Sequence, residues 1–280
     1  MEQDESTRAL DSFVAKWIAA EPELGIALNF LSPSQRASHA AFACLARELA
    51  HTCFAIREGD VAVAKLGWWH EELLRTQQGE PRHPLTQTLA LHMDVSRLDP
   101  TLLNAVIAAA LLQRERDPAS DFADQIANFE KLFLPLADIE ATIFGDLDSV
   151  GTARAAALSH ALREVAGVTR VLESGHLALP LAALARHRLQ RDQLGVDSPE
   201  RRRAAADQLH AIVAGLDEPA NGETRCSVVS QASRIADRTR ARRASRADDP
   251  IAELVRQMPK LSMATTWKIW RAARRQKTNA

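Results

Sequence analysis

Hydrophobic positions recur at helical spacing along almost the whole chain. Between residues 42 and 56 the apolar side chains stand three or four positions apart, which places them on one helix face: Phe42, Leu45, Leu49, Cys53 and Ile56. The start of this helix is marked, because Ser32 and Gln35 have the spacing of a capping box and Pro33 suits the first turn. The pattern therefore predicts a long helix that begins near residue 33.

The same period predicts helices along the rest of the chain. We expect them at 62–73, 100–112, 122–143 with a bend at Pro135, 152–172, 199–216 after a Ser198 cap, from about 227, and 263–276. Gly175 ends the helix over 152–172, and residues 218–223 are typical of a surface loop. No stretch alternates apolar and polar residues long enough to predict a strand. We therefore expect an all-α fold with no internal boundary or repeat.

Composition narrows the class of protein without naming a function. The 280 residues are 46 % hydrophobic and 25 % charged, as in globular proteins, and 35 basic against 36 acidic residues leave no basic field for nucleic acid. Three cysteines without a CxxC pair argue against a disulfide framework or a zinc ribbon. The N-terminus is acidic and no apolar run approaches the roughly 20 residues that span a bilayer. We expect a cytoplasmic protein.

Three segments carry the candidate chemistry: Arg47-Glu-Leu-Ala-His-Thr-Cys-Phe-Ala55, Lys65-Leu-Gly-Trp-Trp-His-Glu-Glu-Leu73 with Pro81-Arg-His-Pro84, and residues 161–180. In this order and spacing they resemble the squalene/phytoene synthase family over about residues 30–215. The resemblance implies a single-domain, isoprenoid-synthase-like helical bundle around a central apolar cavity. That domain would span residues 1–280, with a core at about 30–258 and a basic C-terminal helix at about 263–277.

Members of that family join two allylic diphosphates head to head, using two aspartate-rich motifs that bind Mg²⁺. Magnesium prefers oxygen ligands, so the carboxylates bridge the metal to the departing diphosphate. At the first motif this chain has Ala50, His51 and Phe54, and no acid occurs between Glu48 and Glu58. At the second motif the matching positions hold other residues: Glu164, Gly167, Arg170, Val171 and Gly175.

The second window also lacks aspartate entirely between Asp148 and Asp192. Glu164 and Glu173 lie nine residues apart and so on opposite sides of a helix, where they do not form a ligand pair. We therefore expect no catalytic residue, no metal site and no cofactor, with Mg²⁺ only if the chain is an active enzyme. The family's aromatic tyrosines are also absent, since the chain has none.

Two arginines keep the phosphate-facing positions of the resembled family. Arg47 and Arg170 are expected to hold an anionic head group, together with His51 and Glu164, since no acid of the lost motifs neutralises them. An ion pair between Arg47 and an acid on a neighbouring helix is the alternative, and His51 is alternatively a helix-surface or hydrogen-bonded interior histidine. No Asp or Glu lies at zinc-ligand spacing with both His70 and His83.

Tryptophans and a basic C-terminal region complete the candidates. Trp69 is expected in the core and Trp68 to face elsewhere. Two basic stretches follow: Arg234, Arg238, Arg240, Arg242, Arg243 and Arg246, opposed only by Asp237, and then Lys268, Arg271, Arg274, Arg275 and Lys277, interleaved with Trp267, Ile269 and Trp270. The second stretch has the pattern of an interfacial helix, with a solvated helix face as the alternative.

The resemblance and the missing acids together give three hypotheses for function. The first is a pseudoenzyme of isoprenoid biosynthesis that has lost Mg²⁺-dependent condensation and acts as an isoprenoid-binding or scaffold/assembly protein. The second is an active prenyltransferase acting on farnesyl or geranylgeranyl diphosphate, and the third a helical interaction protein without a lipid ligand. The expected partners are an isoprenoid or prenyl diphosphate, a protein partner, and the inner membrane surface through the basic C-terminal helix, but no nucleic acid.

Overall fold

The computed structural model describes residues 2–145, 147–218 and 225–278. Within these ranges the chain forms α-helices and two short 3₁₀ helices and contains no strand, which confirms the all-α prediction. The α-helices are α1 Glu2–Ala20, α2 Pro22–Leu28, α3 Pro33–Phe54, α4 Gly59–Gln77, α5 Pro84–His92, α6 Pro100–Arg114, α7 Phe122–Phe144, α8 Ser149–Ala166, α9 Val168–Glu173, α10 Leu181–His187, α11 Pro199–Asp217, α12 Val228–Ala244, α13 Pro250–Gln257 and α14 Met263–Thr278. The 3₁₀ helices are Val95–Arg97 and Asp192–Gly195.

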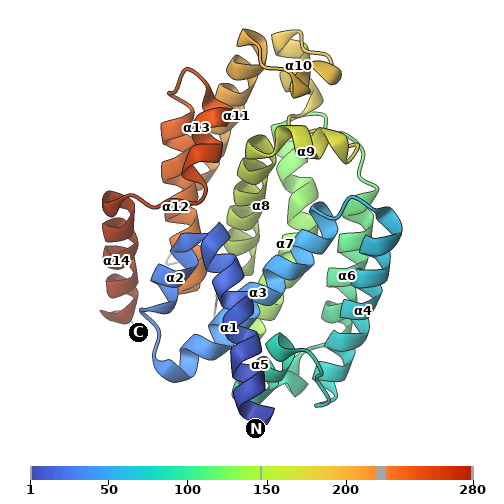
Figure 1. Ribbon diagram of the computed structural model, residues 1–280, viewed down its shortest axis with the longest axis vertical. Helices are drawn as coiled ribbons and strands as arrows, with labels where there is room; N and C mark the ends of the chain where they lie inside the picture. Colours follow the sequence, from blue (N-terminus) through green and yellow to red (C-terminus); the bar gives the residue numbers. More distant parts are fainter. Residues whose placement is uncertain (1, 146, 219–224, 279–280) are drawn as a thin grey trace.

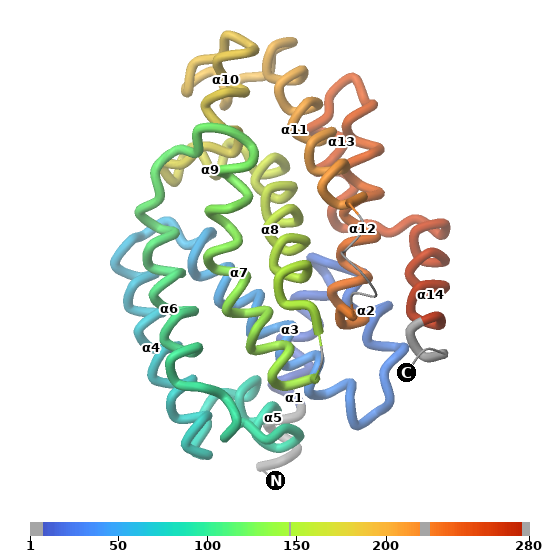
Figure 2. Tube along the Cα trace, turned by 180° about the vertical axis from the view of Figure 1, so that it is seen from behind, coloured from blue at the N-terminus to red at the C-terminus, as the bar shows by residue number. Residues whose placement is uncertain are grey.

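The helices form one bundle around α3, α7 and α8 (Figure 1). Helices α7 and α8 pack along their lengths, α4 and α6 cover one side of the bundle, and α11, α12 and α13 cover the other. Seen from behind, α14 lies outermost, against α12 and α2 (Figure 2). None of the helices described is long and apolar enough to cross a bilayer.

Helix starts follow the caps that the sequence marks. Ser32 and Gln35 form the expected capping box, in which the backbone N–H of Gln35 donates to the Ser32 hydroxyl at 3.4 Å. Asp99 caps α6 by accepting the backbone N–H of Thr101, and Ser198 caps α11 by accepting that of Arg201. The first long helix ends at Phe54, two residues before the last apolar position of its predicted face, Ile56. Of the predicted loop 218–223, only residue 218 lies in the described part of the chain.

The single helix predicted over 152–172 is wrong, because the chain breaks it at Gly167 into α8 and α9. Gly167 leaves the helical region with φ −101° and ψ 29°. A Cβ there would lie 2.8 Å from Nη2 of Arg170, so the glycine leaves room for that guanidinium to fold back over the backbone. Apolar spacing continues through the break, because Val165 and Val168 on its two sides bury in the same core.

The tryptophan motif has a structural role. Trp69 is 1 % exposed among the core side chains, whereas Trp68 is 40 % exposed, which confirms the expected difference. Three residues after Trp69, the buried Glu72 accepts the backbone N–H groups of Arg82 and His83, both at 2.8 Å. This Glu72 clasp fixes the Pro-Arg-His-Pro turn, and with it the start of α5, against α4.

The N-terminal helices belong to the same bundle, although the predicted core begins only at about residue 30. In α2, Leu24, Ala27 and Leu28 are buried against α12 and α14. Helix α1 packs on α2, α3 and α5. Residues before position 30 therefore take part in building the interior.

Candidate functional site

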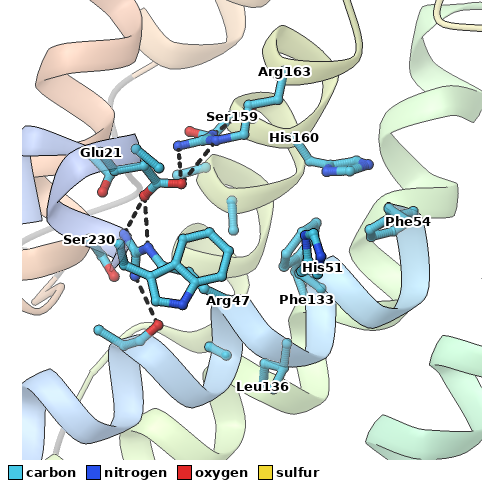
Figure 3. A pocket seen from close by; sticks show the side chains of 18 of the residues that line it. Glu21, Arg47, His51, Phe54, Phe133, Leu136, Ser159, His160, Arg163 and Ser230 are labelled. Atoms are coloured by element: carbon cyan, nitrogen blue, oxygen red, sulfur yellow. Dashed lines mark hydrogen bonds and ion pairs between the residues drawn. The ribbon is translucent and has the colours of Figure 1, made fainter. Parts of the chain in front are cut away.

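A cavity of about 510 Å³ lies inside the bundle, between α3, α7, α8 and α12 (Figure 3). This volume lies within the range of small-molecule sites. Its wall is mainly alanine and large apolar side chains: Ala43, Ala46, Ala50, Phe54, Phe133, Leu136, Ala137, Ala155 and Ala156. The short alanine side chains leave the space, since each removes volume that a larger residue would fill. The cavity agrees with the central apolar cavity that the resemblance implies.

The positions matched to the two motifs face this cavity. Ala50, His51 and Phe54 line it from α3, and Glu164, Gly167, Arg170 and Val171 line it from α8 and α9. Gly175 is the exception: it lies in the turn after α9 with φ +86°, outside the lining. All the matched positions except Gly175 therefore line the same cavity.

Arg47 lines the cavity, but the expectation that nothing neutralises it is wrong. Its Nε and Nη2 lie 2.8 and 2.6 Å from Oε2 of Glu21, and its Nη1 donates to the Ala43 carbonyl at 3.0 Å (Figure 3). The alternative reading, an ion pair with an acid on a neighbouring element, is the one that the structure shows. Glu21 comes from the junction of α1 and α2.

Glu21 also belongs to a larger cluster, which we call the buried charge network: Glu21, Glu23, Arg47, Arg163, Asp237 and Arg240. Arg163 donates to Oε1 of Glu21 at 3.1 Å and to Asp237 at 3.2 Å. Arg240 contacts Asp237 at 2.8 Å and both oxygens of Glu23 at 2.8 Å. Three guanidinium groups thus face three carboxyl groups, and the network carries no formal net charge.

The network fixes the ionisation of its members. Burial raises the pKa of Glu21, but Arg163 and Arg47 outweigh burial and lower it to about 2. Burial has the stronger effect on Glu23, whose pKa is raised despite its bond to Arg240. Asp237 and Glu21 raise the pKa of Arg163, although its burial acts in the opposite direction. Glu21 and Arg163 therefore stay ionised at neutral pH.

Arg170 differs from Arg47, since its side chain makes no hydrogen bond or ion pair with the described part of the chain. It lines the cavity with an exposed side chain, near three other basic groups that we call, together with it, the cationic rim: Lys16, His51, Lys65 and Arg170. Burial lowers the pKa of His51, and Lys16 lowers it further. The rim contains one acid, Glu48, which binds Lys16 and lies 3.5 Å from Nζ of Lys65.

Glu164 has a cation of its own. Arg116, just after α6, places Nη2 2.6 Å from its Oε1, and Nε2 of His160 lies 3.3 Å from the same oxygen. The Arg116 guanidinium also lies over the Phe54 ring, 5.3 Å from its centroid. The Arg116 guanidinium therefore contacts one position matched to each motif, Phe54 and Glu164. Glu164 contributes a neutralised carboxylate to the cavity rather than a free one.

The cavity end near Glu164 is aromatic. The His160 ring lies 3.9 Å from Phe54 and 4.7 Å from Phe129, centroid to centroid. Burial lowers the pKa of His160, so the imidazole is neutral at pH 7. Sequence reasoning missed His160, although its spacing of four residues before Glu164 on one helix signals the contact. It also missed Glu21 and Arg116, for which no local signal exists.

The donor set does not fit a magnesium cluster. The carboxyl groups that line the cavity are Glu21, Glu140 and Glu164. Arginines occupy the first and the last, while burial raises the pKa of Glu140, which the Ser227 and Ser230 hydroxyls bind. Across the described ranges, no three His, Cys, Asp or Glu side chains gather in a way that could hold a metal. We therefore derive no step through a metal.

Candidates outside the cavity have other partners. Glu173 pairs with Arg57, and Nε2 of His70 lies 2.6 Å from Oδ1 of Asn104. The basic stretch of α12 is not opposed by Asp237 alone, because acids of other helices reach it. Asp217 of α11 pairs with Arg238 and Arg242.

Comparisons with known proteins find similar solved structures, but no matching family model or curated protein. Among solved structures, a dehydrosqualene synthase in complex with a ligand is similar with a TM-score of 0.64 and 11 % identity over 99 % of both chains. Squalene synthase HpnC from Alicyclobacillus acidocaldarius is similar with a TM-score of 0.52 and 20 % identity, over 97 % of this chain and 95 % of that one. The chain is thus a single-domain, all-helical bundle with the fold of squalene and dehydrosqualene synthases.

Proposed function

We propose that this protein binds an isoprenoid ligand with an anionic head group and has lost Mg²⁺-dependent prenyl condensation. The observation that carries the proposal is an apolar cavity lined by Arg170, whose side chain has no ion pair among the described residues, while each carboxyl group in the described wall already has a protein partner. The apolar tail would lie among the alanine and phenylalanine side chains. The head group would lie at the cationic rim, within reach of the Arg170 guanidinium.

The charge balance of the rim favours an anion. Lys16, Lys65 and Arg170 supply three positive charges, and Glu48 supplies one negative charge. His51 stays neutral at pH 7, because its pKa is lowered. A phosphate or diphosphate would add the missing negative charge and accept hydrogen bonds from Arg170. Arg47 contributes to the shape of the wall and not to this balance, since Glu21 neutralises it.

Loss of condensation follows from the groups that face the ligand. Ionisation of an allylic diphosphate needs a Lewis acid or an equivalent charge on the leaving oxygens. The two matched motifs offer alanine, histidine and phenylalanine on α3, and a carboxylate held by Arg116 on α8. The bound diphosphate would therefore remain intact. Such a protein would retain or present an isoprenoid, or support the assembly of a partner, rather than transform its ligand.

A metal-free titration with a non-hydrolysable farnesyl diphosphate analogue tests the proposal. We expect wild type to bind, and Arg170→Ala to weaken binding by about 10- to 100-fold, as for the loss of a charge-assisted hydrogen bond. Arg154→Ala is the matched control, because this exposed arginine of α8 pairs with Glu130 and Glu218 outside the cavity. Equal affinities of wild type and Arg170→Ala would contradict the proposed head-group site.

A second measurement distinguishes binding from catalysis. The protein is incubated with farnesyl diphosphate and Mg²⁺, and released diphosphate is measured over time. We expect no release above the protein-free control. Release that disappears in Arg170→Ala would establish the alternative of an active prenyltransferase. If neither the analogue nor a neutral isoprenoid alcohol binds, the remaining hypothesis is a helical interaction protein that has no lipid ligand.

A further inference from the structure

The outer face of α14 carries a solvent-exposed apolar stripe. Met263, Trp267 and Trp270 follow the spacing i, i+4, i+7 and are 87, 55 and 38 % exposed. The opposite face of α14 is used for packing, since Ile269 and Ala273 are 1 % exposed and the helix lies against α12 and α2. The stripe therefore points away from the bundle, on its outermost helix (Figure 2).

Positive charge surrounds this α14 stripe. The helix contains no acidic residue, and its described cations are Lys268, Arg271, Arg274 and Arg275. Arg271 lies over the Trp267 ring and Arg274 over the Trp270 ring, at 5.5 and 4.5 Å from the centroids. Lys268, Arg271 and Arg275 make no ion pair within residues 2–145, 147–218 and 225–278. The side chain of the fifth predicted cation, Lys277, lies outside the described residues.

The arginines of the neighbouring basic helix α12, in contrast, have partners within the bundle. On α12, Arg238 and Arg242 bind Asp217, and Arg240 is buried in the charge network. Arg234 donates to the carbonyls of Leu216 and Glu218. These arginines of α12 thus hold the bundle together, whereas Lys268, Arg271 and Arg275 of α14 make no ion pair with the described part of the chain.

We propose that α14 docks the protein on an anionic membrane surface, with its tryptophan stripe at the level of the lipid head groups. Tryptophan favours this level, because the ring is amphipathic, and flanking cations attract anionic lipids. The helix would lie in the plane of the interface. A second copy of the chain is a poor partner for this face, because two acid-free helices with four described cations each would repel. The inference does not rest on the proposed function of the cavity.

Vesicle co-sedimentation of the full chain tests the docking. We expect binding to phosphatidylcholine vesicles that contain phosphatidylglycerol, weak binding to phosphatidylcholine alone, and release at high salt. The pair Lys268→Glu and Arg271→Glu should weaken binding by at least about 25-fold, at about fivefold for each cation. The pair Trp267→Ala and Trp270→Ala should weaken binding by at least about tenfold, since it removes the apolar part of the contact.

Matched variants control for general stickiness. Leu91→Ala with Leu112→Ala removes two apolar side chains that are 67 and 68 % exposed on α5 and α6. Arg186→Glu reverses an exposed arginine on α10. Both should bind vesicles as wild type does. Trp267→Phe with Trp270→Phe should still bind, but should lose the blue shift of tryptophan emission that wild type shows on anionic vesicles.

Three outcomes would overturn the proposal. One is no binding of wild type to anionic vesicles; another is unchanged binding in the charge-reversal pair. The third is a dimer in sedimentation velocity that Trp267→Ala with Trp270→Ala converts to a monomer, which would assign the stripe to a second copy. Thermal melts of all variants accompany the binding data, so that a loss of folding is not read as a loss of docking.

Discussion

Two arginines of the same cavity have opposite environments. Arg47 lies in the buried charge network and is held by Glu21, whereas Arg170 lies on the cationic rim and has no ion pair in the described part of the chain. The sequence resemblance does not distinguish the two, because it matches both to phosphate-facing positions. The difference teaches that an arginine serves a ligand only when the fold leaves its charge unbalanced. Arg47 is bound into the wall of the cavity, whereas the exposed Arg170 is the group that the proposed ligand would contact.

The largest expected effect tests the network side of this comparison. Arg240→Met should lower the free energy of unfolding by about 3–5 kcal/mol, because it leaves Glu23 buried without its cation and removes one of the two cations that pair with Asp237. Arg238→Met, two positions earlier, removes a partly exposed pair with Asp217 and should cost at most about 1 kcal/mol. Urea denaturation measures both. Similar losses in the two variants would show that the network has no special weight.

A pH series gives the next largest effect. The pKa of Glu21 is lowered from 4.5 to about 2, so its contribution to stability is complete above pH 4.5 and is lost as the pH falls towards 2. Between pH 5 and pH 3, wild type should lose about 2 kcal/mol more than Glu21→Gln. Glu23 acts in the opposite direction, because its pKa is raised. Comparison with Glu21→Gln isolates the effect of this one carboxyl group, and Glu200→Gln, at a partly exposed position, is the control. Parallel curves of unfolding free energy against pH for wild type and Glu21→Gln would contradict the prediction.

A smaller effect concerns the rim. Glu48→Gln removes the acid that Lys16 and Lys65 share, so the rim gains one unit of positive charge. Affinity for the farnesyl diphosphate analogue should rise by up to about fivefold, the size of one charge pair at close range in water. Glu71→Gln, on an exposed face of α4, should leave affinity unchanged. Weaker binding in Glu48→Gln would mean that Glu48 positions the two lysines rather than offsetting them.

The smallest expected effect is that of magnesium alone. A ligand that binds only the native state raises the melting temperature as its concentration exceeds its Kd. We expect millimolar Mg²⁺ to cause no more change than NaCl at the same ionic strength, since each carboxyl group of the cavity wall already has a protein partner. Differential scanning calorimetry in both salts makes the comparison. A clear rise in Mg²⁺ only would reveal a metal site and favour the prenyltransferase alternative.

Local features of this protein could be predicted from its sequence, and distant ones could not. Caps such as Ser32 and Ser198 mark helix starts, and helical spacing places Ala50 and Phe54 on one cavity-facing side. The break at Gly167 is hidden, because apolar residues keep their period across it. The partners that decide the charge of the site come from far along the chain: Glu21 is 26 residues from Arg47, and Arg116 is 48 residues from Glu164.

The Glu72 clasp gives a structural role to the segments on which the sequence resemblance rests. The Trp-Trp-x-x-Glu and Pro-Arg-His-Pro segments meet at a buried carboxylate that holds two backbone amides, away from the cavity. Loss of this clasp would affect folding, independently of what the cavity binds. Side chains of the cavity wall can therefore change without disturbing this contact. The residues of the clasp are evidence about the architecture, whereas the charged side chains of the cavity wall are evidence about what the cavity can bind.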